Sequence, residues 1–330
     1  MRKTILTGIK PTGTPHLGNY FAAIKPALEM AQDENFSSYF FLADYHALTT
    51  VQNAEELKAN TLELASTWLA CGLDPSKVLF YKQSSIPEIF ELTCILNNVT
   101  PKGLMNRAHA YKALVEKNQE AGEDIDANVN MGLYTYPILM SADILLFGTD
   151  LVPVGLDQKQ HIEIARDIAN YFNNKFGKVL NVPEEKISEK VAVIPGLDGR
   201  KMSKSYNNVI PLFCEENKLK KLINRIVTDS SDPSEPKPTD SFIFKLYELF
   251  ANEQEIKEMK TRFENGIGWG EAKKCLFEKA NEVISPMREK FNYYMSHPIE
   301  VNKILDEGSA RAREIAKANL EKIKKAIGVN

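Results

Sequence analysis

The sequence predicts an α/β fold, with a parallel sheet covered by helices, a helical insertion and a mostly α-helical second domain. In the first 85 residues, short apolar segments alternate with longer helical segments. From residue 86 to 127 the strand signal gives way to short helical patterns, and beyond residue 205 the chain becomes helical and charged. With 330 residues, 43% of them hydrophobic, the chain is long enough to bury a core of this kind.

The elements follow from hydrophobic periodicity and helix-capping signals. Asn53, with Glu56 three residues later, makes a capping box that begins a helix, and Asp157 with Gln160 makes another. These criteria predict strands at 4–9, 39–43, 77–81 and 190–194, helices at 19–32, 53–70, 136–147, 157–173 and 309–327, and loops at 10–15 and 150–155. Strands that alternate with helices indicate a Rossmann-like sheet, with the ligand site at the carboxyl ends of its strands.

The predicted domain organisation follows from the same pattern. Residues 1–205 form the sheet domain, with an insertion at about 86–127. Residues 206–296 form a helical domain, and residues 297–330 carry a last helix that packs back on the sheet domain.

Composition and charge narrow the class of protein. The formal net charge of −3 argues against binding nucleic acid by bulk electrostatics. The basic C-terminal segment fits either a solvated helix face or a contact with RNA. No apolar run approaches the ~18 residues that span a bilayer, so we expect a cytoplasmic protein that does not bind membranes. The cysteines are scattered without Cys-x-x-Cys spacing, which indicates neither a zinc site nor a disulfide framework.

Two short segments carry the chemistry. The first is Thr14-Pro15-His16-Leu17-Gly18-Asn19, which lies between a predicted strand and a predicted helix. A helix N-terminus offers unpaired N–H groups to an anion. The second, Lys201-Met202-Ser203-Lys204-Ser205, places two ammonium groups on a short stretch after Gly196 and Gly199. Such groups can follow charge that develops on a departing phosphate. Together the segments predict a site that handles phosphates.

The pair resembles the HIGH and KMSKS signatures of class I aminoacyl-tRNA synthetases, with Asn19 in the last HIGH position and the second signature complete. Residues 134–146 and 150–161 resemble the amino-acid and ATP site of the bacterial-type tryptophanyl-tRNA synthetases, and the resemblance covers essentially the whole chain. It implies ATP-dependent activation of L-tryptophan to tryptophanyl-adenylate, followed by transfer to tRNA(Trp). It also implies Mg²⁺ that accompanies ATP, an anticodon-binding role for the helical domain, and a homodimer formed through the insertion.

The resemblance carries site residues over by position. It implies catalytic roles for His16, Asn19, Lys201 and Lys204 and no metal site made by the protein itself. The implied ATP-binding residues are Lys10, Pro11, Thr12, Gly18, Asn19, Gly155, Leu156, Asp157, Ile194, Lys201, Met202, Ser203, Lys204 and Ser205. The implied tryptophan-binding residues are Leu6, Gly8, Tyr136, Met140, Asp143, Val152, Val154 and Gln158. Lys10 and Leu156 depart from the commonest family pattern, which has glutamine and a polar residue at these positions.

Asp143 is the residue that the resemblance assigns to the indole N–H, and the assignment makes physical sense. Indole has a single donor, and a carboxylate in an apolar pocket accepts from it while leaving a side chain without that donor poorly satisfied. The alternative is an ordinary helix-face carboxylate bound to solvent or to a lysine. The apolar neighbours of Asp143 in the sequence favour a buried carboxylate, which needs a partner.

Other functions remain as alternatives. A tyrosyl-tRNA synthetase shares both signatures but needs a phenol-recognising Tyr/Asp pair in place of the segment 140–143. A nucleotidyltransferase of the HIGH superfamily would normally be shorter and lack the helical domain. A non-catalytic RNA-binding relative would be expected to have damaged signatures, whereas both lysines of the second signature are present here.

Overall fold

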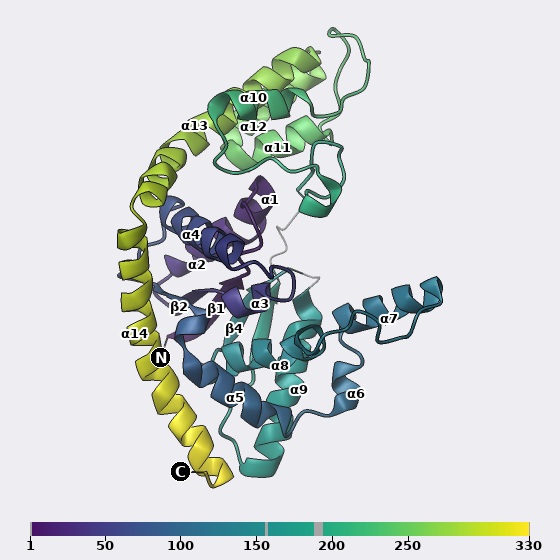
Figure 1. Cartoon of the computed structure of the whole chain (residues 1–330). Coiled ribbons are helices and arrows are strands. Elements are labelled where there is room, and N and C mark those ends of the chain that lie inside the picture. Colours follow the sequence, from purple (N-terminus) through teal and green to yellow (C-terminus); the bar gives the residue numbers. More distant parts are fainter. Residues whose placement is uncertain (1, 156–157, 188–193, 330) are drawn as a thin grey trace.

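We describe a computed structural model of the chain, which covers residues 2–155, 158–187 and 194–329. Within this part of the chain, five parallel strands form one sheet in the order β3-β2-β1-β4-β5 (Figure 1). The strands are β1 (Lys3–Ile9), β2 (Phe36–Leu42), β3 (Leu79–Lys82), β4 (Leu151–Val154) and β5 (Glu184–Ile187). β1 pairs with β2 along its whole length and with β4 at Ile5 and Leu151.

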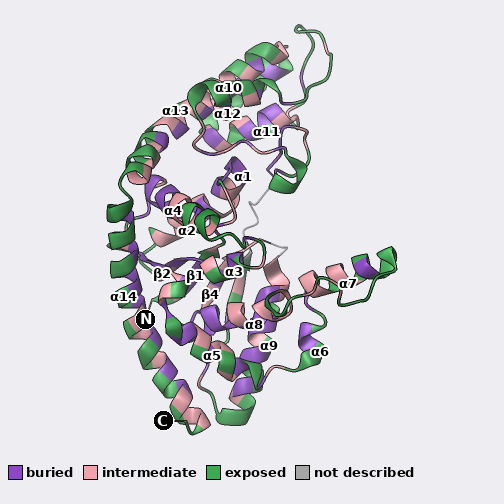
Figure 2. Cartoon of the chain, viewed as in Figure 1, coloured by how far each residue is buried: buried purple, intermediate pink, exposed green. Residues whose placement is uncertain are grey.

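Helices cover both faces of the sheet, as predicted. On β2, the neighbouring residues Phe40 and Phe41 are both buried and belong to two different hydrophobic cores, because successive side chains point to opposite faces. Figure 2 shows both layers of buried residues flanking the strands. One face is covered by α1 (Leu17–Asn19), the π-helical segment η1 (Tyr20–Ile24), α2 (Lys25–Ala31) and α4 (Ala54–Ala70), and the other by α5 (Pro87–Asn97), α8 (Met131–Leu146) and α9 (Lys159–Phe176).

Side-chain caps set where two of these helices begin. Asn53 Oδ1 accepts a hydrogen bond from Glu56 N at 3.0 Å, so α4 begins at the predicted position. Asn130 Oδ1 accepts from Leu133 N at 2.8 Å, and α8 therefore begins five residues before the predicted start at 136. The remaining short elements of this half are α3 (Asp44–Ala47), η2 (Gln83–Ser85), α6 (Lys102–Met105) and α7 (His109–Ala121).

The second half of the chain is helical. Its first helices are η4 (Lys204–Tyr206), α10 (Glu216–Asn224), α11 (Phe242–Phe250), α12 (Glu253–Glu264) and α13 (Trp269–Ser296). Their buried faces, including Leu219, Phe263 and Leu276, continue the core that lies on the α4 side of the sheet. The helical half is thus packed against the same face of the sheet that carries the helix after β1.

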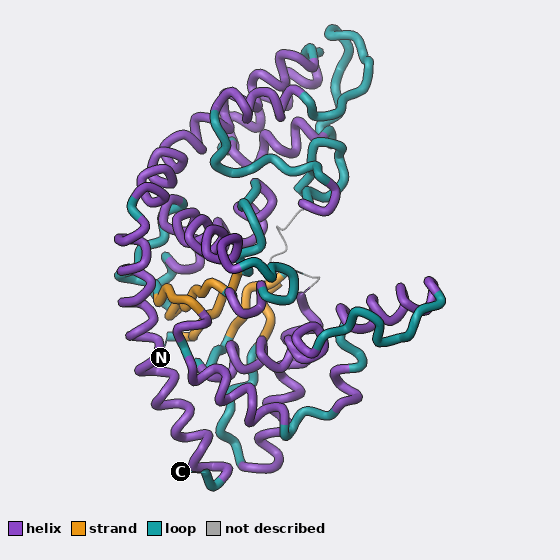
Figure 3. Tube along the Cα trace, in the orientation of Figure 1, coloured by secondary structure: helices purple, strands orange, loops and turns teal. Residues whose placement is uncertain are grey.

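The last helix, α14 (Pro298–Ile327), covers the edge strand β3. A Cβ atom on Gly308 would lie 1.8 Å from the Phe80 carbonyl oxygen, so only glycine allows the helix to come this close to the strand. Arg313 also pairs with the buried Glu88 of α5 at 2.8 Å. Figure 3 shows α14 running along one side of the sheet from the helical half to the C-terminal end. It begins at Pro298, eleven residues before the predicted start.

The segment 150–155 corrects a sequence prediction. The sequence predicts a loop here, but residues 151–154 form β4, which pairs with β1 and, through Val152 and Val154, with β5. Pro153 argues against a strand in the sequence, because proline lacks the N–H that would donate to a neighbouring strand. β5 was not predicted, because Glu184, Glu185 and Lys186 give a sheet-edge strand without an apolar pattern.

Two further predictions fall wholly or partly outside the described residues. The strand at 190–194 is one of them, since only Ile194 is described. The second is the capping box of Asp157 with Gln160, because Asp157 is not described. The described partner, Gln160, uses its side chain elsewhere: its oxygen accepts from His109 N at 2.9 Å, and its nitrogen donates to the Arg107 carbonyl at 3.0 Å.

Candidate active site

The two signature segments meet at the carboxyl end of β1. The backbone after the lysine segment pairs with the first motif: Leu17 N donates to Ile210 O at 3.0 Å, and Leu212 N donates to Pro15 O at 3.0 Å. Asn19 Oδ1 accepts from His16 N at 3.0 Å and so caps the start of α1. Segments almost 200 residues apart in the sequence therefore form one surface at the edge where the fold predicts a ligand.

Met202 and Gly18 form the contact between the two motifs. Gly18 N donates to Met202 Sδ at 3.4 Å, and the Met202 side chain is buried. A Cβ atom on Gly18 would lie 2.9 Å from the His16 ring and 3.5 Å from Met202 Cβ. The packing of the His16 ring against the start of the helix thus requires glycine at position 18. This is a structural reason for the glycine, in addition to the predicted close approach of a nucleotide.

The two lysines of the second segment are placed differently. Lys204 Nζ donates to the Thr12 carbonyl at 2.9 Å, across the glycine turn at Gly13, whose φ of +94° favours glycine. The Lys201 side chain is exposed. Thr14 Oγ1 donates to Glu63 Oε2 at 3.3 Å, which ties the same turn to α4. The Lys204 ammonium group is therefore held beside the turn after β1.

His16 is held neutral. Its side chain is buried, and burial followed by the charge of Lys204 lowers its pKa to about 4. Within the described part of the chain, its Nδ1 atom has no hydrogen-bond partner. A neutral imidazole with an unpaired nitrogen can donate or accept a hydrogen bond at neutral pH without adding a charge.

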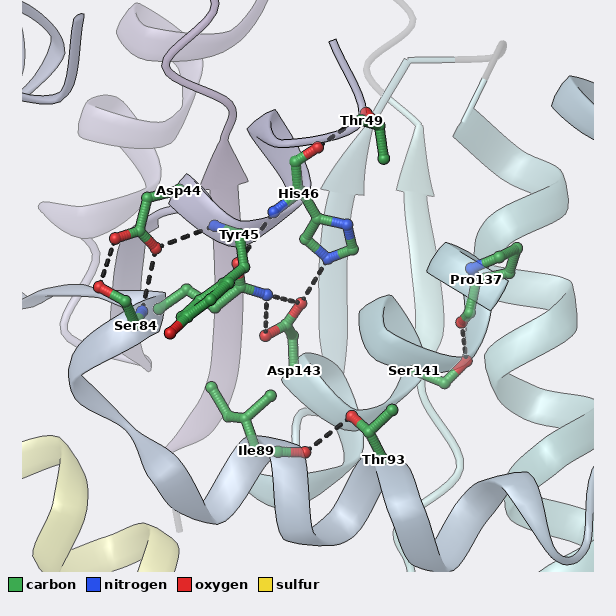
Figure 4. A network of polar contacts seen from close by, with 11 residues as sticks. Asp44, Tyr45, His46, Thr49, Ser84, Ile89, Thr93, Pro137, Ser141 and Asp143 are labelled. Carbon is green, nitrogen blue, oxygen red and sulfur yellow. Dashed lines mark hydrogen bonds and ion pairs between the residues drawn. The ribbon is translucent and has the colours of Figure 1, made fainter. Parts of the chain in front are cut away.

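Asp143 marks the other end of the site. It lies on α8, its exposed fraction is 1%, and two side chains bind its carboxylate (Figure 4). His46 Nε2, from α3, is 2.9 Å from Oδ2, and Gln83 Nε2, from η2, is 2.9 Å from both oxygens. These partners are a histidine and a glutamine, so the alternative of a solvent- or lysine-bound carboxylate is wrong. Burial raises the pKa of Asp143, and the hydrogen bonds from His46 and Gln83 offset the rise only in part.

A second polar chain lies beside this carboxylate. Tyr136 OH is 2.5 Å from His161 Nε2, and His161 Nδ1 is 2.8 Å from Gln158 Oε1. The rings of Tyr136 and His46 meet edge to face, with centroids 6.3 Å apart. Three predicted tryptophan-binding residues, Tyr136, Asp143 and Gln158, thus come together through two histidines.

The other predicted tryptophan-binding residues are mainly apolar. Leu6 and Val152 are buried, and Met140 and Val154 are half-buried against the same core. A Cβ atom on Gly8 would overlap the Phe41 ring at 2.3 Å, so glycine is required there by packing.

The remaining predicted ATP residues spread over several elements. Lys10 is exposed just after β1, Pro11 is buried next to it, and Ile194 is buried in the core on the α4 side. Ser203 N donates to Asn208 Oδ1 at 2.8 Å, and Ser205 is exposed in η4.

A cleft of about 420 Å³ includes Gly155 and Val154 together with Thr7. Most of the other lining residues belong to η1, α2 and the start of β2. Two of the predicted binding residues therefore border a cleft that lies beside α2, over one face of the sheet. Leu156 and Asp157, which follow Gly155 in the sequence, lie outside the described residues.

Sequence reasoning missed four polar residues of this region: His46, Gln83, His161 and Glu63. Gln83 directly follows β3, and a polar residue at the carboxyl end of a parallel strand is a signal that could have identified it. His161 lies in the segment 150–161, whose resemblance to the family implies no role for this histidine. The pairing of His46 with Asp143 spans 97 residues and has no local signal.

The described residues contain neither a metal-binding cluster nor a membrane-spanning helix. Among them, no group of three or more His, Cys, Asp or Glu side chains is arranged to hold a metal ion. Nor does any helix in the same ranges have the length and apolar character needed to cross a membrane.

Comparison with known proteins identifies the family. A model described as tRNA synthetases class I (W and Y) matches residues 2–285. The chain is 49% identical over 330 residues to a tryptophan–tRNA ligase of Neisseria meningitidis serogroup A, with 99% of this chain and 98% of the relative covered. It is 50% identical to the corresponding Pseudomonas aeruginosa ligase over 333 residues, which covers 100% of this chain and 74% of the relative.

A solved structure agrees with these relatives. The crystal structure of tryptophanyl-tRNA synthetase from Campylobacter jejuni, complexed with ADP and tryptophan, matches with a TM-score of 0.89 and 44% identity. The match covers 99% of this chain and 100% of that chain. The chain therefore belongs to the tryptophanyl-tRNA synthetases, within the W and Y family of class I tRNA synthetases.

Proposed function

We propose that the protein is a tryptophan–tRNA ligase that activates L-tryptophan with ATP and transfers the acyl group to tRNA(Trp). The observation that carries this proposal is the docking of the lysine segment on the histidine–glycine segment, made by the Gly18–Met202 and Lys204–Thr12 contacts. This surface suits phosphates, and the buried Asp143 network lies on the same domain. The synthetase relatives support the same activity.

The first half-reaction needs no protein nucleophile. A carboxylate oxygen of tryptophan attacks the α-phosphorus of ATP, the bond from that phosphorus to the bridging oxygen breaks, and pyrophosphate leaves. Catalysis is then positioning plus stabilisation of charge. We assign Lys201 and Lys204 to the charge on the leaving pyrophosphate, and His16 and Asn19 to the bound ATP. In the second half-reaction a ribose hydroxyl of the tRNA attacks the acyl carbon and AMP leaves.

We assign Mg²⁺ to the phosphates of ATP. Lys10 and Lys204 lie at the turn after β1, together with the Glu63 carboxylate that Thr14 binds. The two ammonium groups suit phosphate oxygens and repel a cation. The ion would then be held by phosphate oxygens and water and would neutralise charge on the nucleotide.

Asp143 is the proposed acceptor for the indole N–H, and Tyr136 and Gln158 complete the polar side of the amino-acid site. Support comes from the burial of the carboxylate among apolar residues, where an unmatched acceptor is costly. Tyrosine, the other amino acid in the description of the family, offers a hydroxyl of different length and position, so it serves as the discriminating substrate.

We assign the tRNA to the helical half and the homodimer contact to residues 86–127. On α10, Lys218, Lys220 and Lys221 are exposed, and Arg225 directly follows that helix on the surface. Such a row of cations suits a phosphate backbone. α7 projects from the body of the molecule (Figure 1), as an arm that contacts a second subunit would. We further propose that the protein acts in the cytoplasm.

ATP–pyrophosphate exchange tests this function directly. With ATP and Mg²⁺, exchange should depend on tryptophan and be weak with each of the other standard amino acids, including tyrosine. Subsequent addition of tRNA(Trp) should give esterified tRNA. Tyrosine-dependent exchange would transfer the proposal to the other branch of the family, and absence of exchange with all amino acids would reject it.

A further inference from the structure

We propose that Gln83 is a positioning residue for amino-acid choice: with His46, it fixes the Asp143 carboxylate so that Oδ1 is the oxygen left for the indole N–H. This inference rests on the proposed function, because it assumes that Asp143 receives the indole. It adds a residue from a different element, η2, that does not itself need to touch the substrate.

The orientation of the Gln83 amide is determined by its two neighbours. Gln83 Oε1 accepts from the backbone N–H of His46 at 3.4 Å, which directs the NH₂ group toward Asp143. Nε2 then lies 2.9 Å from Oδ1 and 2.9 Å from Oδ2. The exposed fraction of Gln83 is 0%, so water cannot replace either contact. The reversed amide would place two acceptors, Oε1 and the carboxylate, against each other.

The two oxygens of the Asp143 carboxylate accept different numbers of hydrogen bonds. His46 Nε2 lies 2.9 Å from Oδ2, and since a carboxylate only accepts, this nitrogen carries a proton. Oδ2 thus accepts from both His46 and Gln83, whereas Oδ1 accepts from Gln83 alone among the described residues. Each carboxylate oxygen can accept about two hydrogen bonds. The remaining capacity therefore lies on Oδ1, and the shared Gln83 contact prevents the carboxylate from rotating.

His46 and Gln83, the two donors to Asp143, are held in place by contacts between α3 and η2. Ser84 N, next to Gln83, donates to Asp44 Oδ1 at 2.9 Å, and the Ser84 hydroxyl donates to Asp44 Oδ2. Asp44 begins α3, the helix that carries His46. Figure 4 shows this pair on one side of the network, with His46 and Asp143 on the other. The link between α3 and η2 keeps both donors at fixed distances, which is how a preorganised site gains specificity.

The test compares tryptophan with its analogue 3-(benzothiophen-3-yl)alanine, which has the same shape but a sulfur atom in place of the N–H. Both are measured by ATP–pyrophosphate exchange in the wild-type protein and in Gln83→Met, which keeps the length of the side chain and removes the amide. We expect kcat/KM for tryptophan to fall about tenfold or more, and the ratio of tryptophan to analogue to fall with it, at an unchanged KM for ATP.

A merely structural role would lower kcat/KM for both substrates by the same factor, and that result would overturn the inference. Gln32→Met, which alters an exposed glutamine, should change neither value. If Gln83→Met does not fold, Gln83→Asn withdraws the amide by one methylene and is measured in its place. An unchanged ratio in that variant contradicts the inference equally.

Asp143→Ala separates this inference from the proposed function. If the wild-type protein does not prefer tryptophan to the analogue, or if Asp143→Ala retains the preference, then Asp143 is not the indole acceptor and both assignments fail. If Asp143→Ala loses the preference while Gln83→Met retains it, only the role of Gln83 fails.

Discussion

The proposed phosphate end and the proposed amino-acid end of the site are built in opposite ways. At the phosphate end, Lys201 and Lys204 are exposed and lie on one short segment, and Lys204 contacts a backbone carbonyl of the turn after β1. At the amino-acid end, Asp143 is buried and its partners come from α3 and η2. A phosphate offers dispersed charge that exposed cations on one segment can meet, whereas one indole donor needs a fixed and desolvated acceptor.

The largest effect should come from the lysines of the phosphate end. Lys201→Ala and Lys204→Ala should each lower the rate of adenylate formation by roughly 10²-fold or more, the scale on which one preorganised stabilising group acts. Single-turnover measurement of adenylate formation checks this, with Lys178→Ala as the control for loss of an exposed lysine elsewhere. A rise in the KM for ATP at unchanged kcat would show ground-state binding instead.

The amino-acid end should respond in substrate choice. Asp143→Ala removes a charged acceptor worth ~1.5–3 kcal/mol, which corresponds to a loss of about 10- to 150-fold in kcat/KM for tryptophan. The KM for ATP should change little, because the phosphate surface is made by other segments. Steady-state exchange with varied tryptophan and varied ATP checks this, and wild-type efficiency with tryptophan would refute the assignment.

The buried His16 makes the phosphate end sensitive to acid. Its pKa of about 4 lies below the ordinary value of 6.5, so between these pH values the unfolded chain binds a proton at His16 and the folded chain does not. Stability should therefore be lost as pH falls from 6.5 toward 4, by roughly 2 kcal/mol at pH 5.

Urea unfolding at pH 7 and pH 5 measures this loss. The difference between the two pH values should be smaller in His16→Gln, which has no titrating imidazole, than in the wild-type protein. Equal differences in the two proteins would contradict the buried, neutral state of His16.

The smallest effect on activation should come from the helical half. Reversal of Lys218, Lys220, Lys221 and Arg225 to glutamate should reduce aminoacylation about tenfold and leave the rate of adenylate formation unchanged, because we propose that these side chains contact the phosphates of tRNA. Matched reversal of the exposed Lys175 and Lys178 should leave both assays unchanged. Equal losses in exchange and aminoacylation would show that α10 supports the adenylate site itself.

The same contrast explains what the sequence could predict. The phosphate end depends on contiguous residues at a strand–helix junction, so its chemistry is visible in the motifs around His16 and Lys204. The partners of Asp143 are polar residues 60 and 97 positions away, and only the sheet and α8 bring them together. The strand β4 escaped prediction for a local reason, since Pro153 interrupts its pattern. β5 escaped because its charged residues lie at a sheet edge, where an apolar pattern is not required.

One measurement tests the division of labour most directly: the ratio of kcat/KM for tryptophan to that for its benzothiophene analogue, compared between Lys204→Ala and Asp143→Ala. Lys204→Ala should lower both values by the same factor and leave the ratio at its wild-type value, because the lysine acts on phosphates common to both reactions. Asp143→Ala should bring the ratio close to one. A ratio that changes in Lys204→Ala, or that survives in Asp143→Ala, would contradict the account.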